Sequence, residues 1–208
     1  MRYPRIHKRL SREKIVRTAA RAFNRRGFNG IGIADIMKEA GLTQGAFSGH
    51  FSSKDELIRE AIDDAFSKNI FLEKQGENRS MDDLLGEYLS VSHRDDIEEG
   101  CPASSLTAEV SRLPRRTRES FLIHVHQVLS SIQSRLPENI RGSNRDATAM
   151  SIFALLLGSI QLARASRGTK LSEAVIEAAT EGAKHLAGGR QAAVQSKAQR
   201  KPAKKRRV

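Results

Sequence analysis

Cysteine and tryptophan are almost absent from this 208-residue chain, which has one Cys and no Trp. A single cysteine, Cys101, cannot form a disulfide within the chain, so a reducing cytosol is expected. The longest apolar run, at 150–160, is about half of the roughly 20 residues that a membrane helix requires. No apolar stretch follows the basic N-terminus, as it would in a signal peptide. We therefore expect no association with a membrane.

The residue patterns of catalytic and metal sites are also missing. No Ser/His/Asp order, glycine-rich phosphate loop or close carboxylate pair is present. His124 and His126 lie two apart on a predicted helix and point about 200° from each other, so they cannot share an ion. We expect neither an enzyme nor a bound cofactor or metal.

Positive charge is abundant, and it lies at the two ends of the chain. Residues 1–26 contain ten Lys or Arg and one Glu, and residues 188–208 contain eight Lys or Arg and no acid. Subtracting both segments from the total of +12 leaves −5 for residues 27–187. Clustered basic charge is typical of nucleic-acid binding, although such a cluster can also be a solvated face. The stretch 188–208 is predicted to be a disordered tail that adds salt-sensitive DNA affinity.

A helix-turn-helix pattern occupies about residues 33–52. Gly41 is placed to end the first helix, because glycine adopts the left-handed conformation without a side-chain clash. Thr43 is placed to cap the second helix by accepting from its free N–H groups. In such a motif the second helix enters the major groove of DNA.

The second helix of this motif divides into an inner and an outer side. Phe47 faces the core, and Gln44 can pair with the edge of an adenine. Ser52 and Ser53 are placed to cap a third helix, and Lys54 in its first turn suits a phosphate oxygen. The residues expected to face the groove are Gln44, Gly45, Ser48 and Gly49.

Apolar periodicity predicts an all-α protein. Residues 1–10 are expected to form a basic arm, in which Pro4 argues against helix. Ser11 is placed to cap the first helix of a DNA-binding head at 11–58. Further helices are predicted at 54–73, 81–96, 115–136, 145–166 and from Ser172 onward.

The run from Ala19 to Ile62 resembles the N-terminal domain of the TetR/AcrR family of bacterial transcriptional regulators. The matching residues are Ala20, Phe23, Gly27, Phe28, Ile36, Ala40, Gly41, Gly45, His50, Phe51, Lys54 and Leu57. The resemblance implies DNA contacts by Thr43, Gln44, Gly45, Ser48, Gly49, His50 and Lys54. For His50, a contact to phosphate and a role in holding the turn remain alternatives. The sequence departs from the family at Ile31-Gly32, where a capping Thr or Ser is usual, and at Ser48, where a Tyr is usual.

The resemblance also implies a function. The span 59–187 would be a helical ligand-binding and dimerisation domain, with the helices at about 145–166 and 171–187 pairing with those of a second copy. The protein would be a cytoplasmic, nucleoid-associated homodimeric repressor that a small-molecule inducer releases from a palindromic operator. The alternative is a non-specific architectural DNA-binding protein without ligand response.

Four residues are candidates for polar groups in a ligand pocket, and for each the alternative is an ordinary core or flank residue. They are His93, Cys101, His124 and Gln161. Cys101 stands in a Gly-Cys-Pro break near His93 and Arg94, and a nearby cation lowers the pKa of a thiol. The segment resembles a family subgroup in which a Gly-Cys motif lies beside the cavity, and some relatives sense electrophiles or oxidants by cysteine. The alternative for Cys101 is a small buried thiol.

Overall fold

The computed structural model describes residues 3–72 and 79–189, and within this part of the chain all regular structure is helical. The all-α prediction is confirmed. The predicted basic tail lies almost wholly outside the described residues. The elements are α1 (Tyr3–Arg26), α2 (Ile33–Glu39), the 3₁₀ helix η1 (Gln44–Gly49), α3 (Lys54–Ser67), α4 (Met81–Tyr88), α5 (Val91–Asp95), α6 (Pro102–Val110), α7 (Arg115–Ser134), α8 (Ser143–Ala165), α9 (Lys170–Lys184) and the π-helical turn η3 (His185–Gly189).

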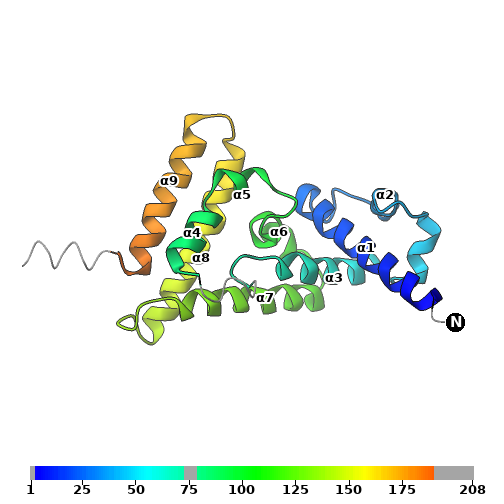
Figure 1. The fold of residues 1–208 in the computed structure, drawn as a ribbon, viewed down its shortest axis with the longest axis horizontal. Helices are drawn as coiled ribbons and strands as arrows, with labels where there is room; N and C mark the ends of the chain where they lie inside the picture. The colour runs from blue at the N-terminus through cyan, green and yellow to red at the C-terminus, as the bar shows by residue number, and fades with distance from the viewer. Residues whose placement is uncertain (1–2, 73–78, 190–208) are drawn as a thin grey trace, which may run out of the picture.

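The helices form a head at one end of the molecule and a larger body at the other (Figure 1). The head consists of α1, α2, η1 and α3, and the body of α4 to η3. Helix α7 runs from α3 toward α8, and α6 lies between the head and the α8–α9 pair (Figure 1). The head is therefore joined to the body over a broad surface as well as by the chain.

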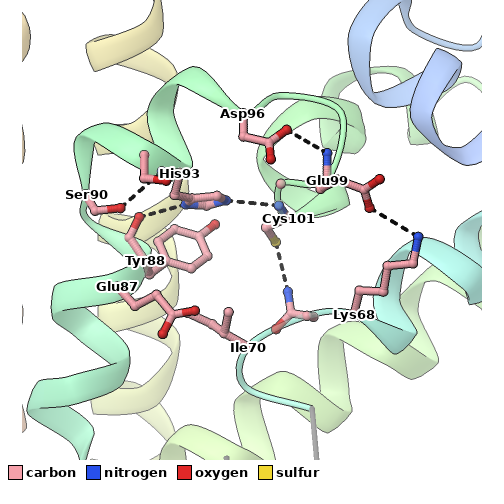
Figure 2. Close-up of a pocket in the computed structure, with 12 residues that line it drawn as sticks. Lys68, Ile70, Glu87, Tyr88, Ser90, His93, Asp96, Glu99 and Cys101 are labelled. Atoms are coloured by element: carbon pink, nitrogen blue, oxygen red, sulfur yellow. Dashed lines mark hydrogen bonds and ion pairs between the residues drawn. The ribbon is translucent and has the colours of Figure 1, made fainter.

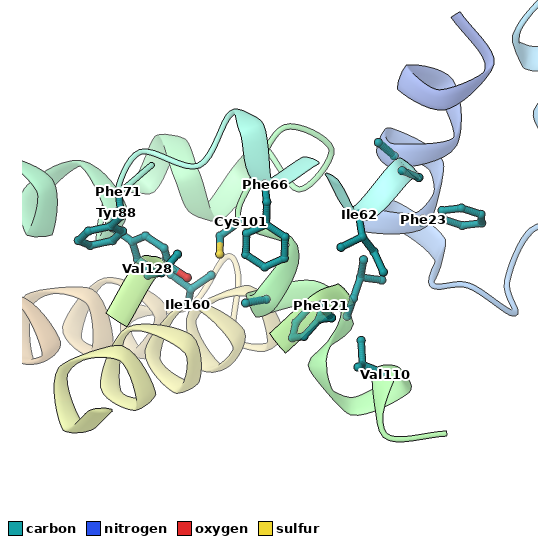
Figure 3. Close-up of a cluster of buried hydrophobic side chains, with 14 of the residues drawn as sticks. Phe23, Ile62, Phe66, Phe71, Tyr88, Cys101, Val110, Phe121, Val128 and Ile160 are labelled. Atoms are coloured by element: carbon teal, nitrogen blue, oxygen red, sulfur yellow. The ribbon is translucent and has the colours of Figure 1, made fainter. Parts of the chain in front are cut away.

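Helix α3 contributes to the cores of both parts. Near its start Leu57 is fully buried in the head, and near its end Phe66 is fully buried in the body. The Phe66 ring meets the edge of Phe121 from α7, with 5.4 Å between ring centroids. Figure 3 shows the buried side chains continuing from Phe23 in the head to Tyr88 in the body. Head and body therefore share one continuous apolar core among the described residues.

The first helix begins earlier than the sequence analysis predicts. Helix α1 starts at Tyr3, so Ser11 lies within it and residues 3–10 do not form a non-helical arm. Pro4 falls in the first turn, where its missing N–H removes no helical hydrogen bond. The expectation that Pro4 opposes helix in this segment is wrong for this reason.

Two other helices differ from their predicted extents. The predicted helix 54–73 ends at Ser67. The predicted helix 81–96 is two helices, because Ser90 starts α5 by accepting a hydrogen bond from the backbone N–H of His93. A serine cap inside an apolar-periodic run is the signal that marks this break.

A second connection between head and body lies in the loop after α1. The Glu109 carboxylate, from α6, accepts from the backbone N–H groups of Phe28 (2.9 Å) and Asn29 (3.3 Å). Gly27 begins this loop with φ of +75°, and a Cβ atom there would overlap the Glu109 carboxylate. The loop thus depends on a glycine for its conformation and on a side chain of the body for its hydrogen bonds.

Helix α8 is the one helix in the described ranges that is long and apolar enough, by length and composition alone, to cross a membrane. An 18-residue stretch of this helix has a mean hydropathy of 1.5, and 39% of that stretch is buried inside the chain. It packs against α9 and also contacts α5, α6 and α7. The core helix of a globular domain meets the same criterion, and α8 has the contacts of such a helix.

Gly27→Ala should destabilise the protein more than Gly168→Ala. Both glycines have similar positive φ, +75° and +83°, so the backbone strain of alanine costs about 1 kcal/mol at either position. A Cβ at residue 168 meets open space, whereas one at residue 27 displaces Glu109. Weakening two charge-assisted hydrogen bonds should add about 1.5 kcal/mol or more to the loss in unfolding free energy. Urea unfolding of both variants measures the difference, and equal losses would contradict it.

Candidate DNA-binding surface and ligand pocket

The helix-turn-helix has the predicted turn but a different second helix. Gly41 has φ of +67°, and the N–H of Leu42 bonds to the carbonyl of Met37 at 2.9 Å, so the predicted end of the first helix is confirmed. The second helix, η1, is a 3₁₀ helix, and Thr43 makes no side-chain capping bond. The Thr43 carbonyl accepts from Ala46 N–H at 3.1 Å instead. Thr43 as a capping residue is therefore a wrong prediction.

The recognition segment, residues 44–49, has the expected inner and outer sides. Phe47 is half-buried and stacks on Phe51, with centroids 5.5 Å apart. A Cβ atom at Gly45 or Gly49 would meet nothing within 4 Å. The orientation is confirmed, and contact with DNA stays a prediction. The exposed residues are Gln44, Gly45, Ser48 and Gly49 within the segment and Thr43 directly before it.

His50 lies at the C-terminal end of this segment and is half-buried. Its carbonyl accepts a hydrogen bond from Arg12 of α1. Burial, followed by the charges of Lys8 and Arg12, lowers the pKa of the ring, so the imidazole is neutral at pH 7. The hydrogen bond from Arg12 involves the His50 carbonyl and not the imidazole, so phosphate contact and turn-holding both remain alternatives for the His50 side chain.

Lys54 has partners within the head. Its Nζ donates to the carbonyls of Phe28 (2.6 Å) and Ile31 (2.8 Å), in the loop whose other side bonds to Glu109. The structure thus places the ammonium group in the loop between α1 and α2. The next residue back, Ser53, caps α3 by accepting from Glu56 N–H, as predicted.

A cavity of about 380 Å³ lies in the body beside Cys101. Figure 2 shows it between the end of α3, the α4–α5 pair and the loop before α6. Of the four predicted ligand residues, His93 and Cys101 line it. The lining is more polar than expected and consists of Lys68, Asn69, Ile70, Glu87, Tyr88, Ser90, Ser92, His93, Asp96, Glu99, Gly100 and Cys101.

His124 and Gln161 do not line this cavity, and ligand contact by either of them stays a prediction. The His124 Nε2 atom is 2.7 Å from an Asp63 oxygen, and its ring stacks on Phe66. Gln161 donates to the Ser104 carbonyl at 2.8 Å. Helical period shows on which face a residue lies, but not which neighbour covers that face.

His93 connects the two walls of the cavity. The Cys101 N–H donates to Nε2 at 3.0 Å, so Nε2 carries no proton. Nδ1 lies 2.7 Å from the Tyr88 carbonyl and must be the protonated nitrogen. Burial lowers the pKa of this ring, consistent with a neutral imidazole. Its hydrogen bonds tie Cys101 to the end of α4.

Cys101 is a buried thiol rather than an activated one. Asn69 Nδ2 lies 3.2 Å from Sγ, and burial raises the thiol pKa. Arg94 is turned away and bonds to Asp95 (2.8 Å) and Ser172 (2.9 Å). The prediction that a nearby cation lowers the pKa is wrong, because burial is the dominant effect.

No three His, Cys, Asp or Glu side chains in residues 3–72 and 79–189 are grouped so that they could hold a metal ion. Residues 15–61 match the family model described as "Bacterial regulatory proteins, tetR family". Over 178 residues the chain is 24% identical to an uncharacterized HTH-type transcriptional regulator of Lactococcus lactis, covering 79% of this chain and 89% of the relative. Residues 15–61 therefore form a DNA-binding domain of the TetR family of transcriptional regulators.

Other TetR-family comparisons agree in fold and motif. The HTH-type transcriptional regulator TtgR of Pseudomonas putida is 36% identical over 76 residues, 36% of each chain. The crystal structure of a TetR transcriptional regulator from Chloroflexus aurantiacus superposes with a TM-score of 0.66 at 26% identity, covering 90% of this chain and 95% of that one. The protein is therefore a DNA-binding transcriptional regulator with a helix-turn-helix.

Three polar residues with structural importance are missed by sequence reasoning. Asn24 is 5% exposed and lies beside Phe23 on the apolar face of α1. The helical periodicity of α1 could therefore have predicted that Asn24 is buried. Arg12 and Glu109 leave no such signal, because each looks like a surface charge on an amphipathic helix.

The Cys101 thiol of the folded protein should react slowly with N-ethylmaleimide. A raised pKa leaves less thiolate at pH 7.5, and burial limits access, so we expect a rate at least about tenfold below that of a free thiol. In denaturant the rate should rise to that of a free thiol. Mass spectrometry of modified protein measures both rates, with Cys101→Ser as the blank. A fast reaction in the folded protein would contradict this.

Proposed function

We propose that this TetR-family regulator is a homodimeric repressor that leaves a palindromic operator when a small molecule occupies the cavity beside Cys101. The observation that carries the proposal is that one short loop forms part of the cavity wall and also bonds to the head. The loop, residues 98–101, has the cavity on one side and α1 on the other.

The contacts of this loop support a coupling between ligand and DNA. Asn24 Nδ2, from α1, donates to the carbonyls of Glu98 and Gly100, both at 3.1 Å. Ion pairs join Arg21 to Glu99 and Arg25 to Glu98. A ligand that displaces Gly100 and Cys101 would therefore act directly on α1 through these contacts.

Helix α6 supplies a second route. It begins next to the cavity at Pro102, and Glu109 near its end bonds to the loop after α1. With a rise of about 1.5 Å per residue, the helix spans roughly 10 Å between Pro102 and Glu109. An inducer that fits one position of α6 better than another shifts the head between two arrangements, and its differential affinity sets the size of the effect.

DNA contact is assigned to the exposed side of the recognition segment. Thr43, Gln44 and Ser48 offer hydrogen-bonding side chains, and Gly45 and Gly49 let the backbone approach phosphates. Lys54 acts through the loop that it holds. The proposed domains are the head at 11–58, extended by the rest of α1, and the ligand-binding and dimerisation domain at 59–187. A cytoplasmic, nucleoid-associated location follows from operator binding.

Dimerisation is supported by an uncovered apolar stripe on α8. Met150 and Leu162 are 54% and 50% exposed, and Ala154 and Gly158 between them are also exposed. Leu171 on neighbouring α9 is 54% exposed. A stripe at spacing of four on the two helices fits a second copy, and paired heads fit a palindromic site.

The inducer is proposed to bind without a covalent bond, because the Cys101 thiol is buried and its pKa is raised. An electrophile or oxidant acting at Cys101 is the second candidate. It is favoured if N-ethylmaleimide releases DNA from the wild type but not from Cys101→Ser.

The operator proposal predicts a protected inverted repeat in the DNA flanking the protein's own gene at about 0.15 M salt. A footprint measures it, with a scrambled duplex of equal composition as the control. Binding that falls steeply with salt and shows no sequence preference would instead establish the architectural alternative.

The dimer proposal predicts that Leu162→Asp separates the protomers. A carboxylate in a desolvated apolar interface should weaken the dimer by at least about tenfold. Leu122→Asp on α7 is the matched control, since Leu122 is 49% exposed and lies off the proposed interface. Sedimentation velocity measures the oligomeric state. Dissociation by Leu122→Asp but not by Leu162→Asp would place the interface elsewhere.

A further inference from the structure

The recognition segment has little intrinsic stability. It is six residues of 3₁₀ helix with no buried residue and no side-chain cap. Gly45 and Gly49 each cost about 1 kcal/mol relative to alanine in a helix. A segment of this kind needs contacts from outside to hold one orientation.

Arg12 of α1 supplies such contacts immediately after the segment. Its guanidinium donates to the carbonyl of His50, the residue that follows the 3₁₀ helix. The same group lies over the Phe51 ring, 4.1 Å from the centroid. Phe51 in turn stacks on Phe47 within the segment. One side chain thus fixes both the backbone and the apolar anchor of the recognition segment.

Two carboxylates of α3 hold Arg12 in this position. Glu60 accepts from Nε at 3.1 Å and pairs with the terminal nitrogen as well, so the pair is bidentate. Glu56 accepts from Arg12 at 2.9 Å and from the N–H and hydroxyl of Ser52 at 2.7 and 2.6 Å. The Ser52 hydrogen bonds and Arg12 lower the pKa of Glu56 to about 2, so this carboxylate is ionised at pH 7.

We infer that Arg12 is a positioning residue for sequence reading: it sets the angle of the recognition segment against the head without contacting a base. The inference rests on the proposed operator binding. Lysine cannot replace it, because an ammonium group cannot bond to two carboxylates and a carbonyl in one plane while stacking on a ring. Lysine does keep the positive charge, which separates positioning from general attraction to phosphate.

The test compares Arg12→Lys with Arg9→Lys, one helical turn away. Arg9 is a highly exposed arginine of α1 and undergoes the same chemical change. The full-length wild type and both variants are each used to select binding sequences from a random DNA duplex library. Affinities are then measured for the selected duplex and for a scrambled one, and circular dichroism melting checks that each variant is folded.

Arg12→Lys should lower the ratio of specific to non-specific affinity by about tenfold or more, the effect of losing charge-assisted hydrogen bonds. Its affinity for scrambled DNA should stay within about twofold, because the charge is retained. Arg9→Lys should change neither value. A ratio within twofold of wild type for Arg12→Lys, or an equal fall for Arg9→Lys, would overturn the inference.

Hydrogen exchange decides the matter independently of operator binding. The amides of His50 and Phe51, which both bond to the Phe47 carbonyl, should exchange faster in Arg12→Lys, while that of Ile62 in the core of α3 should not change. Glu60→Gln should show the same pattern more weakly. If the wild type selects no common sequence, operator binding fails, and unchanged exchange at His50 and Phe51 then rejects the positioning role too.

Discussion

The apolar core that α3 shares between head and body constrains every other feature of the molecule. Leu57 and Phe66 are buried at opposite ends of one fourteen-residue helix, so displacing the body strains the packing of the head. Protein interiors are close-packed and deform little, so a switch between two discrete arrangements costs less free energy than a continuous bend. In the proposed mechanism, a change in the body would therefore move the whole head.

Polar contacts at the edge of this core also join the head to the body. Asn24 bonds to the 98–101 loop, and Glu109 bonds to the loop after α1. Both contacts use backbone groups on one side, so their geometry is set by the main chain rather than by a mobile pair of side chains. Head and body are thus joined by hydrogen bonds to the main chain, and the cavity beside Cys101 lies next to the first of them.

Sequence patterns located the helices and the motif because both depend on neighbours in the chain. Gly41 ends its helix as its conformational freedom predicts, and Phe47 faces inward as the spacing of Leu42 and Phe51 requires. Contacts between distant residues leave no such pattern. Glu109 meets Phe28 across 81 positions, and a lone glutamate on a helix surface has many possible partners. The raised pKa of Cys101 could not be predicted either, because it depends on burial by elements that are distant in the sequence.

The separation of the exposed recognition segment from the buried core has a consequence for evolution. Positions 45 and 49 have empty space around them, and the segment that contains them buries no residue of its own. In the proposed complex, side chains at these positions would replace the close approach of the backbone with new side-chain contacts to DNA, and the core would stay undisturbed because both positions are open. Descendants of such a protein could then change their target sequence through a few substitutions while folding stability stays nearly constant.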